Sequence, residues 1–218
     1  MTIPLEIIDL SKTYDSKEAV RNISFKVNEN EIIGILGPNG CGKTTTIGMI
    51  LGLLKPTKGK VLINGIEIEK QRVELLNELN FISPYIELPK KLTVKQNLEV
   101  YGRLYDVKEL GIKIDYLCEK LRLNEFINKI TGELSSGQKN RVSLAKSIIN
   151  DPSVLLLDEP TASLDPETGD FVRSFLEEYQ KERKTSILLA SHNMAEVERL
   201  CSSVLMMNKG TIIDQGIP

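Results

Sequence analysis

The sequence predicts an α/β fold with an N-terminal antiparallel β-subdomain and an inserted helical lobe. Two observations predict this class. Apolar runs of strand length recur in residues 1–83 and again in residues 151–218, with helical patterns between them. Residues 84–150 instead carry helical periodicity and helix-capping signals. The 218 residues can bury one substantial core, so we expect one domain over residues 1–218, with the lobe at 84–150 inserted into the α/β core.

The first third of the chain is expected to be rich in β-strands. Leu5–Leu10 and Ile23–Val27 have the length and composition of short strands, and a turn at Glu29-Asn30 leads into the apolar strand Ile32–Leu36. Asn64-Gly65 lies between two apolar residues and predicts a hairpin, because this pair tolerates the positive φ angles of a type I′ turn.

Helices are expected after the strand Ile32–Leu36 and throughout residues 84–150. Thr44–Leu54 has apolar residues at helical spacing. Thr93-x-x-Gln96 is a capping box that begins a second helix, and Tyr116–Leu123 predicts a third. Another capping box, Ser135-x-x-Gln138, begins a fourth.

The core is expected to resume with the apolar run Val154–Leu157, which is typical of a strand covered on both faces. Asp165-Pro166 then begins a helix. Its predicted buried stripe consists of Phe171, Phe175 and Tyr179. Ile187–Ala190 predicts another buried strand, and a closing hairpin is expected around Asn208–Gly210.

Composition and charge disfavour several classes of protein. The net charge of −2 has both signs interspersed, so we expect no nucleic-acid partner. No apolar run reaches the roughly 18 residues of a membrane-spanning helix, and the N-terminus lacks the basic region of a secretory signal. Cys41, Cys118 and Cys201 are few and widely spaced, which indicates reduced thiols of a cytosolic protein.

Gly37–Thr44 (GPNGCGKT) matches the phosphate-binding pattern G-x-x-x-x-G-K-[ST] between a predicted strand and a predicted helix. Glycines let successive backbone N–H groups turn toward phosphate oxygens, and the helix N-terminus adds a partial positive charge. Lys43 is expected to reach the β- and γ-phosphates, and the hydroxyl of Thr44 to coordinate Mg²⁺. The motif therefore predicts nucleotide binding.

Polar residues follow two of the buried strands, where ligands bind in open α/β sheets. Asp158 and Glu159 follow the strand Val154–Leu157, and His192 follows the strand that ends at Ser191. We expect Asp158 to hold Mg²⁺ and Glu159 to accept a proton from attacking water. His192 is expected to contact the γ-phosphate and to hold that water against Glu159.

Taken together, the ordered motifs GPNGCGKTT, LSSGQ, LLLDEP, SLD and ASH resemble the nucleotide-binding domain of ATP-binding cassette (ABC) proteins. The resemblance extends over essentially the whole chain. It implies a P-loop NTPase core of the RecA-like type, with ATP and Mg²⁺ as cofactors, and a head-to-tail dimer in which each ATP lies between two cassettes.

The resemblance also assigns roles to residues. Catalysis would fall to Lys43, Glu159 and His192, and Mg²⁺ would be held by Thr44 and Asp158. The expected ATP-binding residues are Tyr14, which would stack on adenine, and Gly37, Pro38, Asn39, Gly40, Cys41, Gly42, Lys43, Thr44 and Thr45. Ser135, Gly137 and Gln138 would act on the ATP of the partner cassette, and Asp165 would link the two opposed sites.

Two positions depart from the family pattern. Ser136 stands where glycine is usual, a mild change because Ser135 and Gly137 are kept. Pro84 stands where the family has a glutamine that touches Mg²⁺ and communicates with the membrane partner. Pro84 cannot replace the amide of a glutamine. We therefore expect this departure to affect the coupling of the cassette to its membrane partner more than ATP hydrolysis itself.

The expected function is the ATP-hydrolysing subunit of an exporter, a minimal cassette on the cytoplasmic face of the membrane. A second cassette, expected to be identical, and a separate integral membrane subunit are the expected partners, the latter docking at residues 84–100. Two alternatives remain open: a degenerate module that binds ATP with little turnover, and a soluble cassette without a role in transport.

Overall fold

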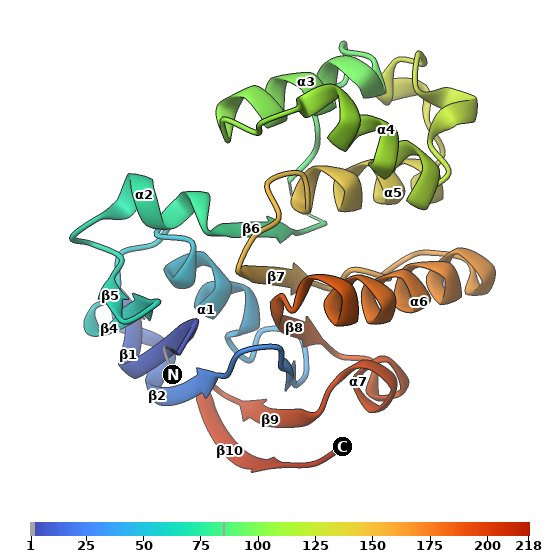
Figure 1. Cartoon of the computed structure of the whole chain (residues 1–218). Helices are drawn as coiled ribbons and strands as arrows, with labels where there is room; N and C mark the ends of the chain where they lie inside the picture. Colours follow the sequence, from blue (N-terminus) through green and yellow to red (C-terminus); the bar gives the residue numbers. More distant parts are fainter. Residues whose placement is uncertain (1–2, 85) are drawn as a thin grey trace.

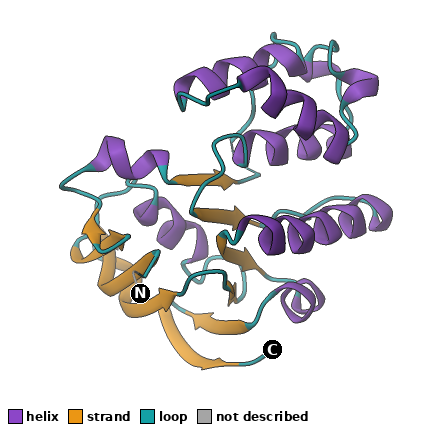
Figure 2. Cartoon of the chain, viewed as in Figure 1, coloured by secondary structure: helices purple, strands orange, loops and turns teal. Residues whose placement is uncertain are grey.

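The computed structural model describes residues 3–84 and 86–218, and it contains two β-sheets with helices around them (Figures 1 and 2). The first sheet has the strand order β2-β1-β4-β5. Its strands are β1 (Leu5–Tyr14), β2 (Lys17–Val27), β4 (Lys58–Ile63) and β5 (Ile66–Glu67). The second sheet has the order β10-β9-β3-β8-β7-β6. Its strands are β3 (Ile32–Leu36), β6 (Leu79–Ile82), β7 (Val154–Asp158), β8 (Ser186–Ser191), β9 (Ser203–Asn208) and β10 (Thr211–Gly216).

The first sheet is antiparallel, and its strands are longer than predicted. β1 continues four residues beyond Leu10 and β2 begins six residues before Ile23, with register shifts along their pairing. Hydrophobic patterning missed these extensions because most of their residues are polar. The hairpin between β4 and β5 confirms the prediction at Asn64-Gly65, where the two φ angles are 50° and 78°.

The second sheet is parallel from β6 through β9, and only β10 runs antiparallel to its neighbour. Every residue of β7 and β8 is buried, as expected for strands with both faces covered. β8 lies between β3 and β7, and Leu36 pairs with Ser191 while Asp158 pairs with Ala190. The carboxyl ends of these three strands therefore meet at one edge.

Seven α-helices occur in the part of the chain that the structure describes. They are α1 (Lys43–Ile50), α2 (Arg72–Asn77), α3 (Val94–Leu104), α4 (Leu110–Lys120), α5 (Ser136–Ser147), α6 (Pro166–Arg183) and α7 (Met194–Leu200). Short 3₁₀ helices lie at Asn124–Phe126 and Thr131–Glu133. Both predicted capping boxes are confirmed, as is the cap of α6 by Asp165.

Three helix predictions needed correction. The helix predicted at Thr44–Leu54 ends at Ile50, because Gly52 adopts a positive φ of 63° and Leu54 folds back on Gly48. The helix predicted at Tyr116–Leu123 starts earlier and ends sooner, at Leu110–Lys120. Phe171 is only half-buried, and the buried stripe of α6 instead includes Val172 and Leu176 with Phe175 and Tyr179.

The sequence interpretation missed α2, β6 and α7. β6 is four residues long and pairs with β7, which lies more than seventy positions away along the chain. Helices of six and seven residues give too little periodicity to stand out. These three elements are fixed by tertiary packing rather than by local sequence.

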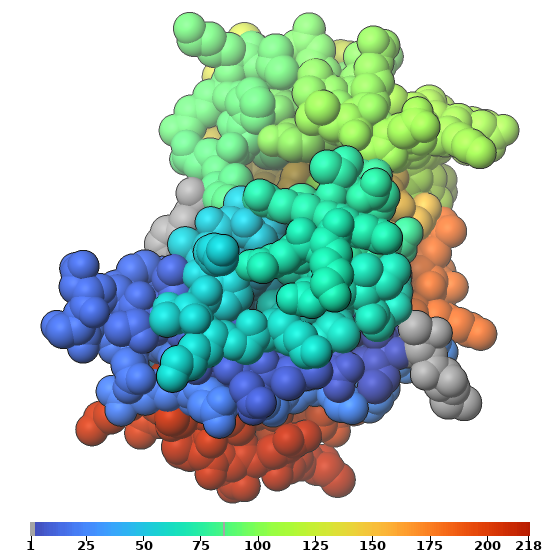
Figure 3. Space-filling view, turned by 90° about the vertical axis from the view of Figure 1, so that its left-hand side faces the viewer, coloured from blue at the N-terminus to red at the C-terminus, as the bar shows by residue number. Residues whose placement is uncertain are grey.

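Helices α3, α4 and α5 lie together on one side of the second sheet (Figure 1). Their buried residues share a hydrophobic cluster with β7 and β8, whereas α1 joins the cluster between the two sheets. From the side, Figure 3 shows the residues of β4, β5 and α2 between this group of helices and the C-terminal hairpin. The division of the chain into a core and a lobe at 84–150 stays a prediction. Within the described residues, no helix is long and apolar enough to span a membrane.

Candidate functional site

The phosphate loop lies between β3 and α1, as predicted. Gly40 and Gly42 have φ angles of 78° and 116°, which glycine adopts at little cost. Gly37 is tightly enclosed, since a Cβ atom there would lie 2.2 Å from the carbonyl oxygen of Met207. Lys43 is buried, and its Nζ donates to the carbonyl oxygen of Gly37 at 2.6 Å. The loop is thus formed around a lysine held by the loop's own backbone.

Asp158 stands at the end of β7 and faces the start of α1. The hydroxyl of Thr44 donates to its Oδ2 at 3.1 Å, and its Oδ1 is buried with no hydrogen-bond partner. Burial raises the pKa of Asp158, while hydrogen bonds with Thr44 and Ser83 act in the opposite direction. An unsatisfied carboxylate oxygen beside a hydroxyl fits Mg²⁺, which proteins often hold through one carboxylate together with substrate phosphates.

Glu159 lies between Lys43 and His192. Its Oε1 is 2.8 Å from Nδ1 of His192, with which it shares a hydrogen bond, and 3.8 Å from Nζ of Lys43. The backbone of Glu159 has a φ of 51°, and its N–H donates to the carbonyl oxygen of Ala190 in β8 at 2.9 Å. The ends of two adjacent strands therefore bring the predicted base and the predicted histidine into contact.

A cavity of about 620 Å³ collects most of the predicted nucleotide-binding residues. The predicted residues that line it are Tyr14, Asn39, Gly40, Gly42, Lys43, Thr44, Thr45, Asp158 and Glu159. Tyr14 is 45% exposed at the end of β1, and the ammonium group of Lys12 lies 5.0 Å from the centre of its ring. Its stacking on adenine stays a prediction. Cys41 is buried and does not line the cavity. Gly37 and Pro38 do not line it either, so the roles of these three residues as ATP contacts stay predictions.

The sequence interpretation missed several residues of this cavity. Lys17, Arg21 and Lys209 line it and add positive charge suited to phosphate oxygens. Lys209 lies at the turn of the closing hairpin, with a φ of 46°. No motif marks these residues, because β2 and this turn come near the phosphate loop only in the folded chain.

The LSSGQ segment lies apart from this cavity and lines none of it. Ser135 caps α5: its Oγ accepts from the N–H of Gln138 at 3.2 Å, and the Gln138 side chain accepts from the N–H of Ser135 at 3.1 Å. Ser135 is exposed. Within one chain, the structure therefore does not bring Ser135, Gly137 or Gln138 to the phosphate loop.

Asp165 caps α6 close to this segment. Its Oδ1 accepts from the N–H of Thr168 at 2.9 Å, and this hydrogen bond lowers the pKa of the carboxyl. Gly137 lies against Thr168, since a Cβ atom at Gly137 would be 3.2 Å from it. The N-termini of α5 and α6 are therefore neighbours on the surface.

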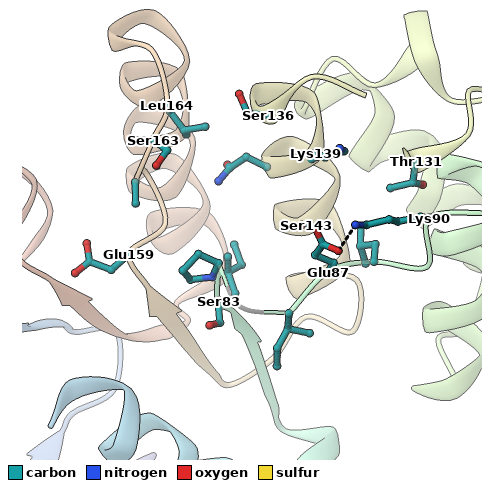
Figure 4. A pocket seen from close by; sticks show the side chains of 16 residues that line it. Ser83, Glu87, Lys90, Thr131, Ser136, Lys139, Ser143, Glu159, Ser163 and Leu164 are labelled. Atoms are coloured by element: carbon teal, nitrogen blue, oxygen red, sulfur yellow. Dashed lines mark ion pairs between the residues drawn. The ribbon is translucent and has the colours of Figure 1, made fainter. Parts of the chain in front are cut away.

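A second cavity of about 240 Å³ lies at Pro84, beside the carboxyl end of β6. Ser83 and Pro84 line one side, Ser136 and Lys139 of α5 another, and Glu159 a third. Figure 4 shows Glu159, Ser163 and Leu164 on one side of the opening and the residues of α5 across from them. The loop predicted around Pro84 also includes Tyr85, which lies outside the described residues. The departure at Pro84 and Glu159, the predicted base, therefore line the same cavity.

Comparison with known proteins identifies the family. A family model described as ABC transporter matches residues 20–162. The ABC transporter ATP-binding protein NatA of Bacillus subtilis (strain 168) is 35% identical over 219 residues, which cover 97% of this chain and 89% of that protein. The Nod factor export ATP-binding protein I of Rhizobium etli is 36% identical over 216 residues, which cover 98% of this chain and 68% of that protein.

A solved structure agrees with these relatives. The dimeric structure of MJ0796, a bacterial ABC transporter cassette, superposes with a TM-score of 0.89 at 25% identity, covering 98% of each chain. The α/β architecture and the P-loop NTPase core expected from the sequence are thereby confirmed. The chain belongs to the ABC transporter family and is one of its ATP-binding, ATP-hydrolysing cassettes.

Proposed function

We propose that this cassette energises export through a separate integral membrane subunit and works as a head-to-tail dimer. One observation carries the proposal: the phosphate loop, Asp158 and Glu159 line one cavity, with His192 hydrogen-bonded to Glu159, while the LSSGQ segment lies outside it. The cavity of one chain thus contains the residues for hydrolysis but not the LSSGQ residues that the family pattern also places at ATP. A second cassette supplies these residues.

Each hydrolytic residue has a distinct task in the proposed mechanism. Lys43 moves from the carbonyl oxygen of Gly37 to the β- and γ-phosphates, where its charge stabilises the charge that develops in phosphoryl transfer. Glu159 accepts a proton from the attacking water, and His192 orients Glu159 through their shared hydrogen bond. Thr44 and Asp158 would hold Mg²⁺, which would supply positive charge to neutralise the phosphate oxygens.

In the proposed dimer, Ser135 and Gly137 of one cassette face the γ-phosphate held by the other. The N-terminus of α5 suits this task because helix N-termini attract anions. Asp165 lies next to Gly137 through Thr168 and links the two opposed sites. The solved dimer of a bacterial cassette with the same fold supports the formation of a dimer.

The proposed membrane partner docks a cytoplasmic loop at residues 84–100, over the cavity beside Pro84. Ile86 is 49% exposed there and Val100 in α3 is 42% exposed, so the surface offers apolar contacts. The proposed location is the cytoplasmic face of the membrane, held through this partner. Export is supported by the printed name of one relative, a Nod factor export ATP-binding protein.

Dimerisation is tested with Glu159→Gln, which should bind ATP without hydrolysing it. We expect size-exclusion chromatography to show a dimer with ATP and Mg²⁺ and a monomer with ADP. The same variant with Gly137→Asp is the control, because a carboxylate at the α5 N-terminus repels the γ-phosphate of the partner site. A monomer under all conditions would contradict the dimer.

The membrane role is tested by purifying the tagged chain from its own cells. We expect an integral membrane protein to co-purify in detergent, and alanine at Ile86 to weaken this association. Co-purification with ribosomes and no membrane protein would contradict the transport role.

A further inference from the structure

Lys146 is a buried lysine in the last turn of α5, far along the helix from LSSGQ. Its Nζ donates to Oδ1 of Asn80 at 3.0 Å and to the carbonyl oxygen of Phe81 at 3.3 Å. The Phe81 and Tyr101 rings lie 4.3 and 5.4 Å from the ammonium group, within the range of cation–π attraction. Lys146 therefore joins three elements: α5, β6 and α3.

The connection between α5 and β6 is reciprocal. The Asn80 side-chain amide donates to the carbonyl oxygen of Lys146 at 3.2 Å and to Oδ1 of Asn150 at 2.8 Å. Asn80 is 1% exposed and Lys146 8% exposed, so these hydrogen bonds are shielded from water. Shielded hydrogen bonds that connect two elements in both directions restrict the angle between those elements.

We propose that Lys146 is a positioning residue for ATP hydrolysis, which holds the helix bearing Ser135 and Gly137 at a fixed angle to the strand that leads to Pro84. The inference rests on the proposed function, because it concerns the geometry in which LSSGQ meets the partner site. α5 has a second anchor, since Asn140 donates to the carbonyl oxygen of Pro160 at 2.7 Å, one residue after Glu159.

The connection extends from β6 to the site. Ile82 pairs with Leu157, the residue before Asp158, and Ser83 hydrogen-bonds with Asp158. A shift of β6 relative to α5 would therefore move the loop at Pro84 and the surroundings of Asp158. Misplacement by about 1 Å in an active site can lower turnover about a hundredfold.

Burial of the Lys146 ammonium group disfavours its charged form. Burial alone lowers its pKa to about 8, and no carboxylate of the described residues pairs with it. The groups that face it are Asn80 and Phe81 from β6 and Tyr101 from α3, of which only Tyr101 is titratable. Below pH 8 the charged amine costs folding free energy, and this cost decreases as the pH rises from 8 toward the usual lysine value. The positioning role explains why a charged side chain occupies a site where its charge costs folding free energy.

The test compares Lys146→Met, Lys146→Arg and Lys113→Met in the whole chain. Lys113 is the matched control: it is also a largely buried lysine among these helices, but it pairs with Asp151 at 2.6 Å. We expect Lys146→Met to match or exceed wild-type stability at pH 7 and to keep ATP affinity, yet to lose about tenfold or more in turnover. Lys146→Arg should restore turnover, and Lys113→Met should lower stability with little change in turnover.

The pH profile gives a second measurement. Wild-type turnover should decline above pH 8 as Lys146 loses its proton, and the Lys146→Arg variant should lack this decline because arginine stays charged. The positioning role is overturned if Lys146→Met keeps the turnover of the wild type, or if Lys146→Arg shows the same alkaline decline. Either result leaves the proposed function of the cassette intact. A wild-type chain that neither hydrolyses ATP nor dimerises overturns the proposed function and, with it, this inference.

Discussion

The N-termini of α1 and α5 serve the same ligand in the proposed dimer but are built in opposite ways. α1 begins after Gly42, which offers no capping side chain and has a φ of 116°. α5 begins after Ser135, where a complete capping box occupies the N–H groups of Ser135 and Gln138. α1 leaves its amides for a ligand within its own chain, whereas the N-terminus of α5 is capped by its own side chains and faces a second molecule in the proposed dimer.

This difference separates the effects of substitution. Changes around α1 should weaken ATP binding or hydrolysis in the isolated chain. Changes around α5 should leave binding by the monomer intact and impair only the steps that require two cassettes. Four experiments test this separation, beginning with the largest expected effect.

The largest effect is expected for Glu159→Gln, since Glu159 lines the cavity at the N-terminus of α1. The amide keeps the size of the side chain but cannot accept the proton from water, so turnover should fall by about 10²–10⁴-fold. ATP affinity should stay near the wild-type value. Steady-state phosphate release and equilibrium nucleotide binding measure the two quantities. Comparable turnover in the two proteins would exclude Glu159 as the base.

Gly37→Ala should reduce ATP affinity about tenfold or more, because the added Cβ meets the carbonyl oxygen of Met207 at 2.2 Å and distorts the loop. Gly137→Ala is the matched change at α5, where the nearest atom, in Thr168, would be 3.2 Å away. Nucleotide titration of the monomer should show a loss for Gly37→Ala only. Equal losses of ATP affinity in the two variants would show that the N-termini of α1 and α5 do not differ in their role in nucleotide binding by the monomer.

Ser135→Ala and Thr93→Ala each remove the capping residue of a complete capping box. Both should lower the free energy of unfolding by about 1 kcal/mol, measured by urea denaturation. Only Ser135→Ala should also reduce turnover, by about tenfold, since Thr93 faces no nucleotide in the proposed dimer. If both variants lost turnover equally, the effect would be one of stability.

The smallest effect is expected at Tyr14. Its replacement by alanine should raise KM a few-fold, in line with about 1 kcal/mol for aromatic stacking, without changing kcat. Replacement by phenylalanine preserves the ring and should leave KM unchanged. An increase in both variants would indicate that the hydroxyl, rather than the ring, contacts ATP.

The sequence predicted those parts of the molecule that depend on local residues. The phosphate loop, both capping boxes and the Asn64-Gly65 turn follow from short segments, whose backbone preferences act over a few residues. The sequence also predicted that Glu159 and His192 lie close together, because parallel strands end at the same edge. It placed an attacking water between them, whereas the structure shows a direct hydrogen bond.

The parts that were missed depend on distant pairings. β6 exists because β7 lies beside it, and Lys17, Arg21 and Lys209 reach the nucleotide cavity only through the fold. Nothing local marks Lys146 as buried, since lysine is almost always exposed. The tertiary environment of a side chain, rather than its type, determined these features.

The register of β8 has a consequence for how this chain tolerates insertions and deletions. β8 is hydrogen-bonded on both sides, with Leu36 opposite Ser191 and Asp158 opposite Ala190. One residue added or removed within β8 would turn every later side chain to the opposite face and carry His192 away from Glu159. Length changes should therefore accumulate in the exposed loops between elements, whereas the spacing from Ser186 to His192 should stay constant among functional variants of this cassette.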